Sequence, residues 1–185
     1  MNRFLPPVAN RAHAERKYEE LRDSARAESE DLFRQQGLDV EFRRFSTDAF
    51  RFVNRTWARR GRRVAWDWAA HFVYRRRKRP TRWDLAIWSR RRLLAMALGY
   101  ASKGGKTILY LEGVERLPGN HPYATMVIPM VLSATERYAR LLGSKWVVLI
   151  KPHPKLIPKY VAAGYNIEYV AAFKEYAAVR ALEAS

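Results

Sequence analysis

The segment KWVVLIKPHPKLIPKYVAAGYNIEYV, residues 145–170, decides the fold. Its apolar beginning, residues 145–151, is typical of a buried strand. Prolines follow, and residues 155–164 have the composition of a short amphipathic helix that ends at Gly164. Residues 165–173 are β-branched and aromatic in part, which favours a second strand. This order indicates an α/β domain, in which the segment is either plain scaffold or one end of an enzyme site.

The rest of the chain predicts further helices and strands. From residue 82 the apolar period changes from nearly four, as in helices, to two, as in strands. Glycine and proline separate the segments. The other predicted elements are a helix over 9–36, a strand over 38–46, helices over 48–60 and 62–79, strands over 82–89, 92–102 and 106–117, a helix over 122–142, and a strand over 176–183, for which a terminal helix is the alternative.

This order predicts a mixed α/β (α+β mixed sheet) domain, with an antiparallel meander followed by crossovers that add parallel strands. We expect residues 38–185 to form this domain and residues 1–37 to be an N-terminal helical extension. The 185 residues fit one domain with such an appendage. The sparse apolar positions of the extension leave two alternatives open, packing on its own domain or on a second copy of the chain in a homodimer.

The composition excludes several classes of protein. The chain has no cysteine, which rules out disulfides, zinc–thiolate sites and a cysteine nucleophile. Its beginning lacks the apolar run of a signal peptide, and no apolar run is long enough to span a membrane. We therefore expect a cytoplasmic protein with no membrane span. Four scattered histidines show no metal-ligand spacing, so no metal is expected; they are His13, His71, His121 and His153.

The net charge of +17 is concentrated in one segment. Residues 51–92 contain 15 Lys and Arg but only two acidic residues, and they also contain five of the six tryptophans. Arginines bind phosphates and aromatic rings stack on bases, so this segment predicts a surface for nucleic acid or an acidic acceptor. The residues expected to form it are Arg59, Arg60, Arg62, Arg63, Arg75, Arg76, Arg77 and Lys78.

A structural interpretation of the same segment remains open. Val64, Trp68 and Phe72 are spaced four residues apart, which is typical of the buried stripe of a helix. The basic run at residues 75–79 ends the predicted helix, where positive charge complements the helix dipole. Five consecutive basic residues exceed what a helix end requires.

Two motifs in the second half of the chain resemble the GCN5-related N-acetyltransferase (GNAT) family. PKYVAAGY places Tyr160, Gly164 and Tyr165 at the family's spacing of tyrosine, glycine and aromatic residue. ERYARLLGSK, residues 136–145, is similar to the end of the family's cofactor helix. With the predicted element order, the resemblance covers about residues 38–183. It implies a GNAT-like acyl-CoA N-acyltransferase fold with an added N-terminal helix, and acetyl-CoA as the bound substrate.

The resemblance also implies a phosphate-binding loop, RLPGNH, at residues 116–121. Glycine lets the backbone approach a pyrophosphate, and N–H groups at a helix N-terminus bind it. Arg116 and Gly119 match the family pattern, whereas His121 replaces a small residue. Pro129 is a second departure, because a helix that begins near it would make the loop an ordinary one. The expected cofactor-binding residues are Leu111, Val114, Arg116, Gly119, Asn120, His121, Tyr123 and His153, with the backbone of residues 109–114 beside the pantetheine arm.

For catalysis, the resemblance implies Tyr160 as the general acid for the departing sulfur, and Glu112 as the base that takes the amine proton. Alternation of side chains predicts Tyr110, Glu112 and Val114 on one face of their strand, and Glu115 is a second carboxylate there. The alternatives are a tyrosine packed in the core and a glutamate paired with an arginine. The function expected is an acetyl-CoA-dependent N-acetyltransferase with an acidic or RNA-linked acceptor, and the alternative is a non-catalytic nucleic-acid-binding module, a pseudoenzyme, on the same scaffold.

Overall fold

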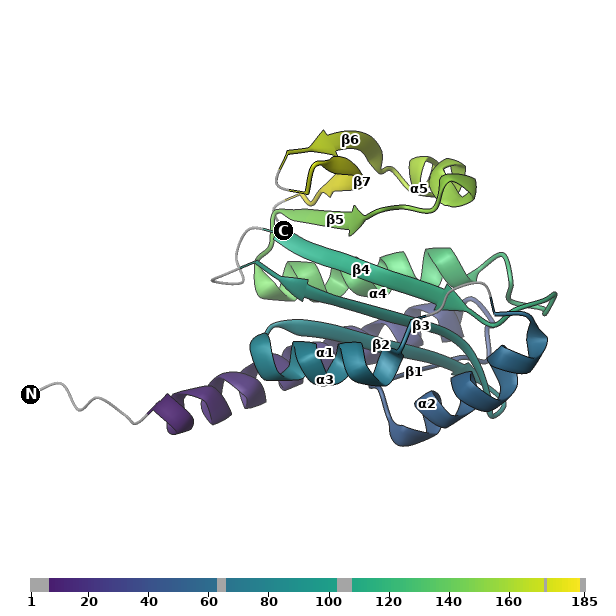
Figure 1. Cartoon of the computed structure of the whole chain (residues 1–185), viewed down its shortest axis with the longest axis horizontal. Coiled ribbons are helices and arrows are strands. Elements are labelled where there is room, and N and C mark those ends of the chain that lie inside the picture. Colours follow the sequence, from purple (N-terminus) through teal and green to yellow (C-terminus); the bar gives the residue numbers. More distant parts are fainter. Residues whose placement is uncertain (1–6, 63–65, 103–107, 172, 184–185) are drawn as a thin grey trace, which may run out of the picture.

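The protein, described as a computed structural model, is built on one seven-stranded sheet (Figure 1). The structure describes residues 7–62, 66–102, 108–171 and 173–183. The strand order across the sheet is β1-β2-β3-β4-β5-β7-β6. The strands are β1 (Glu41–Arg43), β2 (Arg82–Ser89), β3 (Arg92–Ala101), β4 (Ile108–Arg116), β5 (Trp146–Ile150), β6 (Asn166–Val170) and β7 (Glu175–Ala181).

The strand directions confirm the predicted mixed sheet. β1 to β4 pair antiparallel as a meander, β4 and β5 are parallel, and β7 lies antiparallel between β5 and β6. A parallel pair needs a crossover connection, and α4 (Val127–Leu142) provides it between β4 and β5. The last segment is a strand, so the alternative of a terminal helix is wrong.

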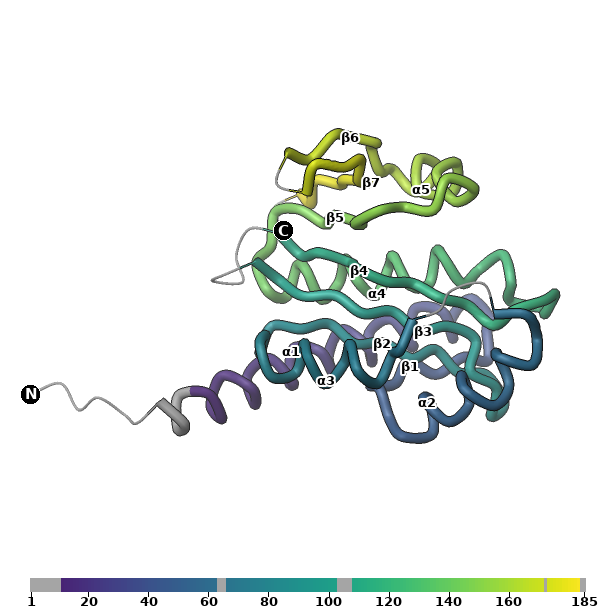
Figure 2. The backbone as a smooth tube through the Cα atoms, in the orientation of Figure 1, coloured from purple at the N-terminus to yellow at the C-terminus, as the bar shows by residue number. Residues whose placement is uncertain are grey.

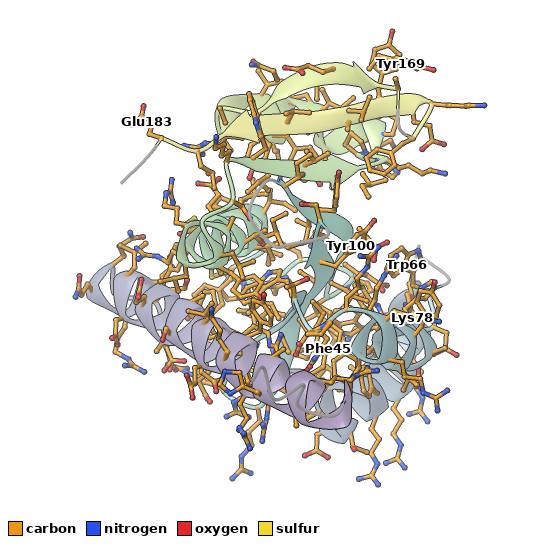
Figure 3. All side chains as sticks on the ribbon, turned by 90° about the vertical axis from the view of Figure 1, so that its left-hand side faces the viewer. Phe45, Trp66, Lys78, Tyr100, Tyr169 and Glu183 are labelled. Carbon is orange, nitrogen blue, oxygen red and sulfur yellow. The ribbon has the colours of Figure 1, made fainter. Side chains whose placement is uncertain are left out.

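The helices cover both faces of the sheet. α1 (Pro7–Gln35) packs against α4 on one face, while α2 (Thr47–Phe52) and α3 (Trp68–Lys78) lie on the other (Figure 3). A π-helical turn, Val53–Trp57, continues α2, and α5 (Ile157–Ala162) follows β5. None of the helices in the described ranges has the length and apolarity that a membrane span requires.

Buried arginines attach α1 to the sheet. Arg22 is fully buried and donates to the carbonyl oxygens of Pro80 (2.8 Å) and Arg82 (3.1 Å), at the start of β2. Arg26 donates to the carbonyl oxygen of Asp84 at 2.9 Å. Figure 2 shows the α1 backbone running alongside the sheet towards β1. The long first helix therefore packs on its own chain.

Two predicted helices begin later than the sequence suggested. α3 begins at Trp68 because Asp67 caps it, its side chain accepting a hydrogen bond from the Ala70 amide. The part of the prediction at residues 63–65, which includes Val64, lies outside the described residues. α4 begins at Val127 rather than at residue 122, which makes Pro129 its third residue. Residues 116–121 therefore form an ordinary loop and do not lie at the N-terminus of the helix, as the alternative based on Pro129 stated. A proline costs no intrahelical hydrogen bond at the third position of a helix, because the first-turn amides have no intrahelical acceptor.

Candidate active site

β4 and β5 separate halfway along the sheet. Their pairing runs from Ile108 with Trp146 to Leu111 with Leu149, and β5 ends at Ile150. β4 continues for five more residues, 112–116, and no described strand pairs with this part of its β5-side edge. Backbone N–H and C=O groups in such a gap are available to an extended ligand.

A β-bulge lies at the point of separation. Leu98 of β3 faces Gly113 and Gly99 faces Leu111, so Glu112 is the extra residue on β4. A side chain at Gly99 would approach the carbonyl oxygen of Tyr110 to 2.3 Å, so only glycine fits opposite the bulge.

The bulge changes which side chains share a face of β4. Glu112 forms an ion pair with Arg75 of α3, and the Nε–Oε2 distance is 2.6 Å. Glu115 is buried and accepts from Arg62 (2.6 and 2.8 Å) and from the indole N–H of Trp68 (2.6 Å). Both carboxylates therefore reach the α3 side of the sheet, which simple alternation did not predict. Each carboxylate forms an ion pair with a guanidinium. Glu112 is therefore a glutamate paired with an arginine, which was the alternative to its role as a catalytic base.

A pocket of about 790 Å³ fills the space where the two strands separate. Its floor is residues 111–114 of β4. One wall comes from the segment that leads into α3 and from α3 itself, and consists mainly of Trp66, Trp68, His71 and Tyr74. The opposite wall comes from β5, the loop after it and α5, and consists mainly of Leu149, Ile150, Pro152, His153, Leu156 and Tyr160. Tyr160, Glu112, Leu111, Val114 and His153, all predicted from sequence, thus meet in one pocket.

Tyr160 has an unusual environment for a buried tyrosine. The residue is 4% exposed, and its hydroxyl has no hydrogen-bond partner in the described part of the chain. Burial raises the pKa of Tyr160 to about 12, so the phenol keeps its proton at neutral pH. Tyr165, five residues further on, is equally buried but donates to Glu136 at 3.0 Å. The hydroxyl of Tyr138 in the core also lacks a partner within the described residues, but Tyr138 does not line the pocket, whereas Tyr160 does.

The aromatic wall depends on Gly113. A Cβ at this position would approach the Trp66 ring to 2.4 Å, so the indole lies directly against the β4 backbone. The Trp66 ring also stacks with His71, at 4.5 Å between ring centroids, and lies 5.3 Å from the Trp68 ring. A flat aromatic surface therefore faces the pocket beside the bulge.

The two histidines of the pocket differ in whether a ring nitrogen is free to accept a hydrogen bond or a proton from a ligand. The Nδ1 atom of His153 accepts a hydrogen bond from the Lys155 amide at 3.2 Å, so in a neutral His153 ring the proton sits on Nε2. His71 is exposed, and its ring nitrogens have no hydrogen-bond partner among residues that the structure describes. A neutral His71 therefore has a lone pair available to a ligand.

The predicted phosphate loop, residues 116–121, follows β4 but does not line the pocket. Gly119 has a positive φ of 88°, and the amides of Gly119, Asn120 and His121 donate to no acceptor in the described ranges. Arg116 donates to the carbonyl oxygens of Leu117 (3.3 Å) and Gly119 (3.0 Å), which closes the loop on itself. Tyr123 lies in the turns that lead into α4.

His121 occupies the loop position where the family pattern has a small residue. Both of its ring nitrogens are buried and have no partner in the described chain. Burial, with Arg116 and Arg60 nearby, lowers the pKa of His121. Both effects favour the neutral form of the imidazole beside the free amides of the loop.

The predicted basic surface is only partly available. Arg62 is bound to the buried Glu115, which requires a cationic partner, and Arg75 is bound to the partly buried Glu112 and also lies 4.2 Å from the Tyr100 ring. These two residues are not free to bind phosphate, contrary to the prediction. Arg63 lies outside the described residues. The remaining five are exposed, with no carboxylate partner among the residues described: Arg59, Arg60, Arg76, Arg77 and Lys78.

The sequence did not identify the aromatic wall as part of a site. Trp68 was expected in the core, where it is found at 3% exposure, and His71 was regarded as isolated. The aromatic wall could have been predicted from the spacing of Trp68, His71 and Tyr74, which places them on one face of a helix. Within the described residues, no group of His, Asp and Glu could hold a metal ion.

Comparison with known proteins identifies the fold. The sequence matches no protein-family model and no curated protein. Among solved structures, the chain is similar to Ard1 from Thermoplasma volcanium (13% identity, TM-score 0.56, 79% of this chain and 99% of that one). It is also similar to the ribosomal-protein-S18-alanine N-acetyltransferase from Escherichia coli (12%, 0.52, 77% and 92%). A third match is the PaiA N-acetyltransferase from Thermoplasma acidophilum, solved with coenzyme A (9%, 0.50, 78% and 100%).

These matches confirm the fold that the sequence motifs predicted. The chain has the GNAT fold, with an N-terminal helix and a mixed seven-stranded sheet. At these identities the likeness defines the fold alone.

Proposed function

We propose that the protein is an N-acetyltransferase that uses acetyl-CoA. The observation that carries this proposal is the pocket between the separated strands β4 and β5, lined by Tyr160, whose hydroxyl has no hydrogen-bond partner in the described part of the chain. A ligand in the pocket that accepts a hydrogen bond from this hydroxyl would gain an interaction that no described residue already makes. The GNAT fold and the coenzyme A complex of PaiA support the choice of ligand.

The residues present fit acetyl-CoA, which would supply an acetyl thioester. The open edge of β4 presents backbone groups to the amides of a pantetheine arm. The amides of residues 119–121 lie in a loop before α4 rather than at its N-terminus, and as free backbone donors they can bind phosphate oxygens. The residues proposed to hold the molecule are those predicted from sequence, namely Leu111, Val114 and His153 in the pocket and Arg116, Gly119, Asn120, His121 and Tyr123 near the loop.

We propose His71 as the base that takes the proton of the acceptor amine. The carboxylate of Glu112, the base implied by the resemblance, already binds Arg75. Glu115 does not line the pocket and is bound to Arg62. Among the described lining residues, His71 is then the base with a free lone pair. Imidazole is a common general base at neutral pH.

Tyr160 is proposed as the proton donor to a leaving sulfur. With a pKa of about 12, it is a weaker acid than a thiol, whose pKa is about 8.5. Complete proton transfer to a thiolate in the free protein's environment would then be uphill by about 5 kcal/mol. The contribution of Tyr160 is therefore expected near the low end of the usual range for general acids, about 100-fold or less in rate.

The experiment that tests the proposal combines binding and turnover. Acetyl-CoA at about 100 times its Kd should stabilise the protein by about 2.7 kcal/mol, which raises the melting temperature by about 5–10 °C for a chain of this size. Release of the coenzyme A thiol should then depend on an added amine. His71→Gln should abolish most of the turnover without changing acetyl-CoA binding, whereas His13→Gln, an exposed histidine on α1, should change neither. The absence of both a melting shift and amine-dependent thiol release would rule the proposal out.

A second candidate function rests on the free basic residues. The exposed side chains of Arg59, Arg60, Arg76, Arg77 and Lys78 favour a nucleic-acid-binding module, whether or not the pocket is active. Binding to RNA or DNA should then weaken steeply with salt, and neutralising Arg76 and Arg77 together should reduce the slope by about two. Equal affinity of the double variant and the wild type at every salt concentration would exclude this function.

A further inference from the structure

We infer that the acceptor amine is carried by an uncharged aromatic group, which packs against the Trp66 side of the pocket. This inference deepens the proposed function, because it names the substrate class of the same site. It rests on two features of the pocket, its charge balance and the shape of its α3 wall.

The charges of the pocket cancel in pairs. Its described lining contains three side chains that are charged at neutral pH, Arg75, Glu112 and Lys151. Arg75 binds Glu112 within the pocket, and Lys151 binds Glu175 at 2.8 Å. An acidic acceptor would find no unpaired cation in this lining, and a polyamine would find no unpaired carboxylate. A second charge on the acceptor would therefore lose its hydration without gaining a partner.

The α3 wall offers an aromatic surface instead. The Trp66 ring lies against the backbone at Gly113 and stacks with His71, so a ring that packs beside it meets an ordered surface. Tyr74 extends this surface towards the pocket mouth, where it is 54% exposed. Aromatic rings gain from such contacts beyond the area they bury.

The aromatic wall lies close to His71, the residue proposed to take the proton of the acceptor amine. Trp66 contacts Gly113, next to the bulge residue Glu112, and stacks on His71, the proposed base. A ring beside Trp66 would hold an amine on a short side chain close to the His71 imidazole. The opposite wall, with Leu149, Leu156 and Tyr160, remains for the acyl donor.

The test compares three primary amines with acetyl-CoA, namely 2-phenylethylamine, spermidine and L-glutamate. The aromatic amine should be acetylated with a kcat/KM at least about 10-fold above that of spermidine or L-glutamate, which both carry further charges. Trp66→Leu should lower kcat/KM for 2-phenylethylamine by about 10-fold, and Trp66→Phe by less, because a ring is retained. The affinity for acetyl-CoA should stay the same in both variants. Trp146→Leu, an equivalent change at the far end of β5, should have no effect on any amine.

A preference for spermidine or L-glutamate would overturn the inference and leave the proposed function standing. An equal loss for all three amines in Trp66→Leu would also overturn it, because the wall would then be structural. Binding of 2-phenylethylamine to the protein without acetyl-CoA, followed by tryptophan fluorescence, separates the two claims. If acetyl-CoA fails to bind but 2-phenylethylamine binds in a Trp66-dependent way, the aromatic site is supported and the transferase function fails. If neither binds, both are wrong.

Discussion

Tyr160→Phe should reduce activity without reducing stability, which is a rare combination for a buried side chain. The substitution removes only the hydroxyl, and that hydroxyl has no partner in the described chain. The hydroxyl lines the pocket and is not one of the fully buried unpartnered atoms, so its removal should change the free energy of unfolding by no more than about 1 kcal/mol. The melting temperature should change by no more than about 4 °C.

Tyr165→Phe provides the matched control. Tyr165 is as buried as Tyr160, but its hydroxyl donates to the Glu136 carboxylate at 3.0 Å. Loss of a hydrogen bond to a charged group costs about 1.5–3 kcal/mol, which lowers the melting temperature by about 3–12 °C in a protein of this size. Its rate of acetyl transfer should not change below the melting range, because Tyr165 does not line the pocket.

The assay measures calorimetric melting and the rate of thiol release with 2-phenylethylamine for both variants. Tyr160→Phe should lose about 10–100-fold in kcat, with little change in the KM for acetyl-CoA. Wild-type kcat in Tyr160→Phe would refute the assignment of Tyr160 as proton donor. Destabilisation equal to that of Tyr165→Phe would show that the hydroxyl has a structural partner after all.

Three further predictions concern the scaffold and the loop. Arg22→Ala should lower the melting temperature by about 6–12 °C, because about 3 kcal/mol is lost when two carbonyl oxygens lose the donor that Arg22 supplies. Arg16→Ala, on the exposed face of α1, should change the melting temperature little. Equal effects of the two substitutions would contradict the role of Arg22. Gly99→Ala should unfold or aggregate the protein, because its Cβ would lie 2.3 Å from a backbone oxygen of β4; wild-type melting would show that the bulge adapts. The lowered pKa of His121 means that the unfolded chain binds a proton more readily, so stability should fall as pH drops below about 6.5. His121→Leu should flatten melting temperature against pH between 7.5 and 5, whereas His13→Leu should not, and identical slopes in all three proteins would contradict this account.

The element order could be predicted from the sequence because the period of the apolar residues and the positions of glycine and proline agree over most of the chain. The apolar strand around residues 146–150 and the glycine stops at Gly143 and Gly164 are local signals, and the structure has the expected elements there. Helix starts were less predictable. Asp67 caps α3 inside the helix predicted over 62–79. The sequence pattern alone does not distinguish an aspartate that starts a helix from one that lies inside a longer helix.

The site could be predicted only in part, because its geometry depends on non-local pairing. The bulge at Glu112 arises from how β3 and β4 pair, and no local pattern in β4 reveals it. The same holds for Arg62 and Arg75, whose carboxylate partners are 53 and 37 residues away in the chain. Their charge predicted a phosphate surface, whereas in the structure both form ion pairs, Arg62 with the buried Glu115 and Arg75 with the partly buried Glu112.

Calorimetric titration of acetyl-CoA into the full chain tests the central claim most directly. It should be repeated with Tyr160→Phe and with Gly119→Trp, which places a large side chain in the loop at a positive φ. We predict one binding site in the wild type, unchanged affinity in Tyr160→Phe and a loss of binding in Gly119→Trp. A folded wild-type protein that takes up no acetyl-CoA would contradict the account, and the space between β4 and β5 would then belong to a scaffold beneath a basic binding surface.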